Sequence, residues 1–179
     1  MYDLFSIKDF SFPKDFAWGT ATAGHQIEGD NVNAQKYYEE KERAYDPTGI
    51  IKPSGKACNH YEMVEEDTKL LSELKIPNYR MSVEWSRIEP TEGFFDESEI
   101  EHYIKELFGL KEKGIKVFLT LHHFTHPMWF EKCGGFKKPE NIKYFERFCE
   151  KVVPLFSPYV DSWNVLNEFN GSVPEFERM

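Results

Sequence analysis

The sequence predicts an α/β fold built on a parallel sheet, and two observations support this prediction. Short apolar runs alternate along the 179 residues with segments whose apolar side chains have helical spacing. The runs "KVFLTL" and "WNVL" lack a regular alternation of apolar and polar residues, which is typical of strands covered on both faces. Alternating strands and helices favour parallel strands joined by right-handed crossovers. An open doubly wound sheet and a (β/α)₈ barrel both satisfy the pattern.

Four strands and three helices are expected. The strands are residues 16–22, 77–85, 115–121 and 160–166. The helices are residues 60–75, 95–114 and 139–156, with Asn59 as the N-cap of the first, Gly114 as the stop signal of the second and Pro139 in the first turn of the third. Residues 30–56 are polar and interrupted by prolines and glycines, so we expect a long loop there.

Composition indicates a globular chain and argues against several classes of partner. Hydrophobic residues make up 40% of the chain, which is too many for a disordered protein. The net charge of −9 and the lack of a long Lys/Arg run argue against nucleic acid and anionic membranes. No run of about 18 apolar residues is present, and the N-terminus has no secretory pattern. Cys58, Cys133 and Cys149 show no Cys-x-x-Cys spacing, so free thiols in a reducing cytoplasm are expected.

Polar side chains follow or lie within each predicted strand: His25, Gln26 and Glu28, then Arg80, then His122, His123 and His126, then Asn167 and Glu168. In a barrel the loops after the strands all open on one face, where active sites lie. Aromatic residues accompany these clusters, namely Trp18, Trp85, Phe124, Trp129 and Trp163. Aromatic faces beside amides, imidazoles and carboxylates suit a sugar, and Trp129 is the aromatic residue expected to contact it.

Each of these signals also has a structural interpretation. His122 and His126 have the i, i+4 spacing of metal ligands, but a strand precedes them and Pro127 interrupts them, so no metal is expected. Adjacent strand residues point to opposite faces, so only one of His122 and His123 can face a site. Arg80, inside a strand, could simply neutralise a buried anion.

Two further signals have equally plain alternatives. Glu168 could be a charge at a helix N-terminus rather than a catalytic group. Single tryptophans belong more often to the core than to a sugar site.

Four stretches in series resemble the N-terminal part of glycoside hydrolase family 1, the β-glucosidase family. They are "FPKDFAWGTATAGHQIEG", "YRMSVEWSRIEP", "TLHHFTHPMWF" and "WNVLNEF". The family folds as a (β/α)₈ barrel, which typically needs ~250 residues. The resemblance covers essentially the whole chain, so it implies that residues 1–179 form the first half of such a barrel, with about four βα units.

The resemblance also implies roles for individual residues. Glu168 matches the family's general acid/base, and Arg80 matches the arginine that positions the catalytic nucleophile. Gln26, His123 and Asn167 match residues that bind sugar hydroxyl groups. The reaction implied is the retaining hydrolysis of terminal β-linked sugars, without a cofactor or a metal ion. It uses two carboxyl groups, of which one is the nucleophile and the other is first acid and then base.

The sequence departs from the family pattern at two places near Glu168 and at the nucleophile. Val165 stands where the family usually has threonine, and Phe169 where it has proline. The family's nucleophile lies in a Glu-Asn-Gly context, whereas here Glu140-Asn141 continues with Ile142. We therefore expect a β-glycosidase truncated before its nucleophile. The alternative is an inactive half-barrel that binds sugar weakly, associates with itself or needs a complementary C-terminal half.

Overall fold

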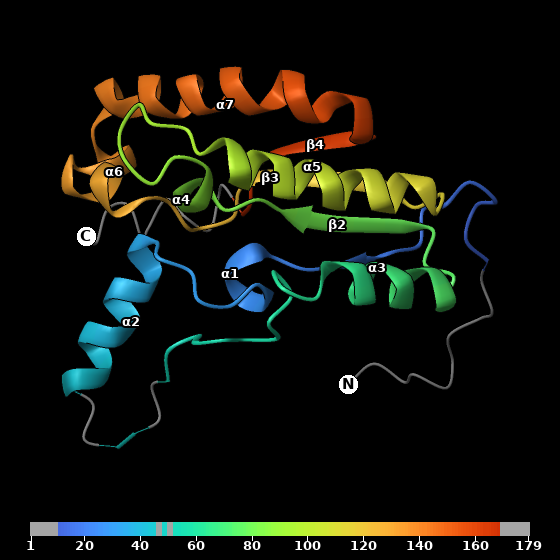
Figure 1. Cartoon of the computed structure of the whole chain (residues 1–179), viewed down its shortest axis with the longest axis horizontal. Helices are drawn as coiled ribbons and strands as arrows, with labels where there is room; N and C mark the ends of the chain where they lie inside the picture. The colour runs from blue at the N-terminus through green and yellow to red at the C-terminus, as the bar shows by residue number, and fades with distance from the viewer. Residues whose placement is uncertain (1–10, 46–47, 50–51, 169–179) are drawn as a thin grey trace, which may run out of the picture.

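The chain contains a four-stranded parallel sheet in the computed structural model, which describes residues 11–45, 48–49 and 52–168. The strands are β1 (Thr20–Ala21), β2 (Asn78–Ser82), β3 (Lys116–His122) and β4 (Ser162–Leu166), and they lie side by side in that order (Figure 1). The prediction of four parallel strands is confirmed. The first strand is shorter than the predicted 16–22, because Phe16 and Trp18 pack against Phe12 rather than pairing with β2.

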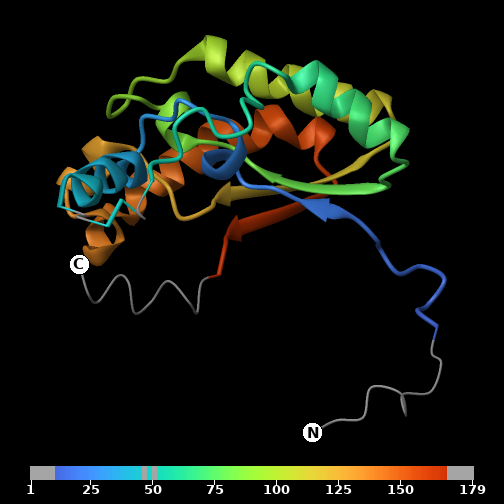
Figure 2. The same ribbon diagram turned by 90° about the horizontal axis from the view of Figure 1, so that it is seen from below.

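Successive strands are joined by α3 (Val64–Glu73), α5 (Glu97–Glu112) and α7 (Ile142–Phe156). Figure 2 shows these helices on one side of the sheet, with no described helix on the other. A doubly wound sheet reverses its strand order and carries helices on both faces, so the sequential order β1-β2-β3-β4 excludes it. The arrangement is the first half of a (β/α)₈ barrel.

The hydrophobic core lies between the sheet and these helices. The strands contribute Tyr79, Met81, Val117, Leu119 and Leu121, the helix α5 contributes Ile100, Tyr103, Leu107 and Leu110, and α7 contributes Phe145, Phe148, Val152 and Phe156. The short helix α4 (Trp85–Ile88) inserts Trp85, whose ring stacks on Phe148 with centroids 5.2 Å apart. The helical spacing read from the sequence therefore identifies the buried faces of α5 and α7.

The opposite face of the sheet is mostly polar and has no helix over it among the described residues, so the covering of both faces that the sequence predicts stays a prediction. Side chains alternate along a strand, and Tyr79, Leu119 and Trp163 pack on the helix side. Their neighbours Arg80 and Thr120 therefore face the other way. This face is the interior of a barrel, which other strands cover rather than helices.

The predicted loop 30–56 contains a helix, α2 (Ala34–Tyr45), which corrects the sequence interpretation. The side-chain oxygen of Asn33 accepts a hydrogen bond from the Lys36 amide at 3.0 Å and so caps the helix start. The segment is rich in alanine, glutamine, lysine and glutamate, which favour helices. Its polar composition concealed it, because it has no broad apolar stripe.

Two other helix boundaries differ from the predictions. The helix α3 begins at Val64, because Asn59 adopts a left-handed conformation with φ 57° and the next residues form turns. The helix α7 begins at Ile142, and Pro139 lies in a short 3₁₀ helix before it. Three further short helices were not predicted. They are α1 (Gly24–Ile27), α4 (Trp85–Ile88) and α6 (Met128–Lys132), which follow β1, β2 and β3. No helix in the described part of the chain is both long and apolar enough to cross a membrane.

Candidate functional site

A cavity of about 400 Å³ lies at the carboxyl ends of the strands. Its lining residues are Ala23, His25, Gln26, Gln35, Glu39, His123, Phe124, Thr125 and Glu168. Gln26 comes from α1 (Gly24–Ile27), directly after β1, whereas His123 follows β3 and Glu168 follows β4. The parallel winding thus brings together three predicted site residues that are far apart in the sequence.

Asn167 and Arg80 form a hydrogen-bonded pair beside the cavity. Asn167 is buried. Its backbone amide donates to the backbone carbonyl of His122 at 2.9 Å, which extends the β3–β4 pairing beyond Leu166. The Nη2 atom of Arg80 donates to Oδ1 of Asn167 at 2.5 Å, and its Nε atom donates to Oγ1 of Thr120 at 3.2 Å. Both acceptors are neutral, so these two hydrogen bonds do not neutralise the positive charge that Arg80 brings to the strand tips.

His123 presents a neutral imidazole to the cavity. Burial, followed by the positive charge of Arg80, lowers the pKa of His123 to about 4. Its Nδ1 atom is buried and has no hydrogen-bond partner in the described part of the chain. A neutral ring offers one donor and one acceptor, which suits a hydroxyl group.

His122 points away from the cavity into an aromatic layer. Its ring contacts Phe136 and Phe145 edge-on, and its pKa is lowered to about 3 by burial and the neighbouring histidines. The expectation that only one of His122 and His123 faces the site is confirmed. The Nε2 atom of His126, in turn, lies 2.9 Å from a carboxylate oxygen of Glu131. Within residues 11–45, 48–49 and 52–168, no three His, Cys, Asp or Glu side chains converge as a metal ion would require.

The backbone is strained at two of the residues that line the cavity. Phe124 has φ 68° and Glu168 has φ 48°, and each lies two residues beyond the end of a strand. A left-handed conformation costs a non-glycine residue roughly 1–3 kcal/mol, and such strain clusters at functional sites. Each of these two adjacent strand tips therefore carries a strained residue where it lines the cavity.

Trp129 does not line the cavity, although the sequence suggested that it contacts the substrate. It lies on α6, and its indole nitrogen donates to the carbonyl of Glu89 at 2.9 Å. Its ring meets Trp85 edge-on with centroids 5.8 Å apart. Both tryptophans therefore belong to the core and its margin. The aromatic residue that does line the cavity is Phe124, which is 40% exposed.

A buried polar layer beneath the cavity was not predicted. Glu28 accepts hydrogen bonds from Tyr103 at 2.7 Å and from Nε of Arg87 at 2.8 Å. Glu84 accepts one from Thr125 at 2.7 Å, and Thr125 lines the cavity. Glu28 was grouped with the polar residues at the strand tips, but it is only 3% exposed and does not line the cavity. The one sequence signal for this layer was the concentration of charge in "VEWSRIEP", just after β2.

The protonation of Glu28 makes stability depend on pH. Burial, followed by the negative charge of Glu84, raises the pKa of Glu28 to about 8. Between pH 4.5 and about 8 the unfolded chain has lost this proton while the folded chain keeps it, so rising pH destabilises the fold. We expect the free energy of unfolding of the wild type to fall relative to Glu28→Gln by up to about 1.4 kcal/mol per pH unit over this range. Urea titrations from pH 5 to pH 8 measure the difference, and a difference that does not change with pH would contradict the assignment.

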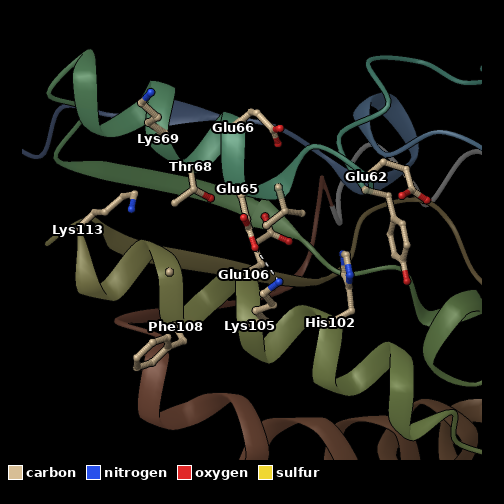
Figure 3. A pocket seen from close by; sticks show the side chains of 13 residues that line it. Glu62, Glu65, Glu66, Thr68, Lys69, His102, Lys105, Glu106, Phe108 and Lys113 are labelled. Atoms are coloured by element: carbon tan, nitrogen blue, oxygen red, sulfur yellow. Dashed lines mark ion pairs between the residues drawn. The ribbon is translucent and has the colours of Figure 1, made fainter.

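A larger hollow of about 820 Å³ lies between α3 and α5, on the outer side of the helix layer. Figure 3 shows Lys105 and Glu65 paired there, with their charged atoms 2.8 Å apart. The Tyr61 ring stacks on His102 with centroids 3.8 Å apart. No predicted site residue lines this hollow, and it contains no strand tip. The cavity at the strand tips is therefore the candidate active site.

Comparison with known proteins identifies the family. The model of glycosyl hydrolase family 1 matches residues 8–175. Beta-glucosidase A from Acetivibrio thermocellus is 34% identical over 162 residues, which are 88% of this chain and 36% of that protein. The human cytosolic beta-glucosidase is 32% identical over 171 residues, which are 89% of this chain and 35% of that protein.

The solved structure of a beta-glycosidase from Pyrococcus horikoshii is 42% identical, with a TM-score of 0.78, covering 88% of this chain and 36% of that one. The chain therefore spans about a third of the length of the curated relatives it matches. Its four parallel strands and helices correspond to the first half of the barrel of these glycosidases. The chain belongs to glycosyl hydrolase family 1.

Proposed function

We propose that the chain supplies the acid/base half of a retaining β-glycosidase that acts on terminal β-linked sugars. The observation that carries this proposal is the cavity at the strand tips, where Glu168 lies with Gln26 and His123. A carboxylic acid, an amide and a neutral imidazole match the hydroxyl groups and the glycosidic oxygen of a sugar. The family membership supports the same reading.

In this proposal Glu168 first gives a proton to the glycosidic oxygen and later takes one from water. Arg80 donates to the side-chain oxygen of Asn167 at 2.5 Å, which orients the side-chain nitrogen of Asn167 to donate to the sugar's 2-hydroxyl group. Gln26 and His123 bind the other hydroxyl groups of the same ring. These interactions orient the sugar so that the acid meets the bond that breaks.

The nucleophile belongs to the complementary C-terminal half in this proposal. The polar inner face of the sheet is where that half would pack, with the charge of Arg80 next to the second carboxylate. The outer edges of β1 and β4 carry no further strand among the described residues, so each can pair with another strand. Self-association through these edges is the alternative, but it would supply no nucleophile.

We also propose that the protein works in the cytoplasm. Cys58 is exposed, and Cys133 and Cys149 are partly buried, all three as free thiols, which is usual in a reducing compartment. One relative is itself named a cytosolic beta-glucosidase.

Sugar binding tests the proposed site. We expect methyl β-glucoside to shift the NMR signals of Gln26, His123 and Asn167 in the isotope-labelled chain. His123→Ala should weaken this binding by roughly tenfold, the order of one hydrogen bond in a partly buried site. Shifts confined to the hollow between α3 and α5, or no shifts at all, would contradict the assignment.

Turnover tests the division of labour between the two halves. The 179-residue chain by itself should not hydrolyse an aryl β-glucoside above the rate without protein, because the second carboxyl group is supplied elsewhere. Release of nitrophenol, monitored by absorbance, measures this. Hydrolysis that is abolished by Glu168→Gln would show that the chain has its own nucleophile and would contradict the proposed division.

A further inference from the structure

One wall of the cavity comes from α2 rather than from a strand tip. Gln35 and Glu39 lie on this helix, which Figure 1 shows beyond the carboxyl ends of the strands. The helix is tied to the segment after β3, because the amide of Ala34 donates to the carbonyl of His126 at 2.9 Å. The hydroxyl group of Tyr38 also donates to Glu131 of α6 at 2.9 Å. The wall is therefore fixed relative to the catalytic end of the sheet.

The carboxylate of Glu39 is held in one orientation. Asn33 donates to Nδ1 of His25 at 3.0 Å, so the ring carries its proton on Nε2 and donates it to Oε1 of Glu39 at 2.9 Å. The second oxygen, Oε2, accepts from the amide of Ser54 at 2.9 Å. The side-chain nitrogen of Asn33 also donates to Oε2 of the buried Glu84 at 2.8 Å. A chain of hydrogen bonds thus connects Glu39 to the interior.

Glu39 remains available to a ligand although it is well anchored. Its side chain is 18% exposed and lines the cavity. Burial raises its pKa, but the hydrogen bonds from His25 and Ser54 outweigh burial, so the pKa is lowered and the group is ionised at neutral pH. Each carboxylate oxygen has two acceptor positions, and the Ser54 amide occupies only one on Oε2.

The position of Glu39 indicates which part of a substrate it would meet. In the proposed function, the ring that reacts lies against the strand tips, where Gln26, His123 and Glu168 are located. Glu168, as the acid, faces the glycosidic oxygen, so the leaving group extends from there toward the rim formed by α2. We propose that Glu39, oriented by His25, is a specificity-determining residue that binds the hydroxyl groups of a sugar leaving group. This inference rests on the proposed glycosidase function.

The charge of the wall supports a neutral, hydroxyl-rich leaving group. The lining residues include the carboxylate of Glu39 and no lysine or arginine among the described residues, and Glu168 carries the proton to be donated in the proposed function. Glu39 would repel an anionic leaving group, and an apolar one would leave the second acceptor position of its Oε2 atom desolvated without a donor. A second sugar ring supplies several hydroxyl donors. The preferred substrate class is therefore an oligosaccharide or disaccharide rather than a simple alkyl glycoside.

A pair of ligands that differ by one sugar ring tests the inference on the whole 179-residue chain. Methyl β-glucoside and methyl β-cellobioside are titrated into isotope-labelled protein, and dissociation constants come from the NMR shifts. The wild type should bind the cellobioside roughly tenfold more tightly than the glucoside. This factor is the order expected from one hydrogen bond to a charged group at a partly exposed site. Glu39→Gln should remove most of this advantage and leave the affinity for methyl β-glucoside within about twofold.

A neighbouring carboxylate provides the matched control. Glu40 is exposed on the same helix and does not line the cavity, so Glu40→Gln makes the same change of charge and should alter neither affinity. Wild-type shifts specific to the second ring should appear at Gln35, Glu39 and Ser54, which tests the proposal even if Glu39→Gln does not fold.

The outcomes separate the two proposals. If methyl β-glucoside binds but Glu39→Gln affects both ligands equally or neither, Glu39 is a structural residue and only this inference fails. If the wild type binds neither sugar, the proposed function and the inference fail together.

Discussion

Replacing Glu168 with glutamine should lower the hydrolysis of alkyl β-glucosides by about 10²–10⁴-fold in a completed barrel. The completed barrel is a fusion of residues 1–168 of this chain to the part of the Pyrococcus horikoshii beta-glycosidase that follows the matched region. The two proteins are 42% identical where they overlap. Glutamine has the shape of glutamate but has no acidic proton to give to an alkoxide leaving group. Steady-state rates with methyl β-glucoside measure the loss.

The nature of the leaving group distinguishes lost acid catalysis from general damage. A dinitrophenyl leaving group departs without protonation, so Glu168→Gln should slow its first release far less than the release of methanol. Glu140→Gln is a suitable control, because Glu140 is exposed and precedes Asn141 in a 3₁₀ helix away from the cavity. Equal losses for both leaving groups would argue that Glu168 only supports the fold.

Replacing Arg87 with methionine should lower the free energy of unfolding by about 3 kcal/mol, because each buried hydrogen-bond acceptor left without a donor costs about 1–3 kcal/mol. Nε of Arg87 donates to Glu28 at 2.8 Å and to Asn31 at 3.0 Å, and its Nη2 atom donates to the carbonyl of Gly29 at 2.6 Å. Its guanidinium group also lies 4.0 Å from the centre of the Tyr61 ring. Methionine fills similar space but leaves these acceptors buried without a donor.

An exposed ion pair gives the comparison for this result. Nζ of Lys69 lies 3.6 Å from Oε1 of Glu73 on α3, and the Lys69 side chain is 72% exposed. Lys69→Met should change the free energy of unfolding by less than about 0.5 kcal/mol, because solvent screens such pairs. Urea denaturation of the two variants and the wild type gives both values. A loss below about 1 kcal/mol for Arg87→Met would contradict the role assigned to the buried layer.

The sequence predicted those parts of the fold that local patterns determine. Helix α5 was recognisable because Ile100, Tyr103, Leu107 and Leu110 recur at helical spacing and Gly114, with φ 72°, ends the segment. The strand tips that carry Gln26, His123 and Glu168 could be located because parallel strands bring their carboxyl ends together. The choice of these three residues among the polar side chains at the tips rested on the family resemblance.

The features that sequence reasoning missed depend on contacts between distant residues. Arg87 and Glu28 form a hydrogen bond although they are 59 positions apart in the sequence, and no local pattern around either residue indicates the other. Helix α2 carries no broad apolar stripe, so Glu39 could not be placed on a cavity wall or paired with His25 from spacing alone. Trp129 was misleading because an aromatic residue near a strand tip can equally join the core, as it does against Trp85.

Rescue by azide tests most directly the claim that Glu168 is the acid/base of a retaining glycosidase. In the completed barrel with Glu168→Ala, no base activates water for the second step, but azide is a nucleophile that needs no base. Azide should accelerate turnover of dinitrophenyl β-glucoside and yield the β-configured glucosyl azide, which NMR identifies. If azide changes neither the rate nor the product, and the parent barrel is active, Glu168 is not the acid/base and the account is wrong.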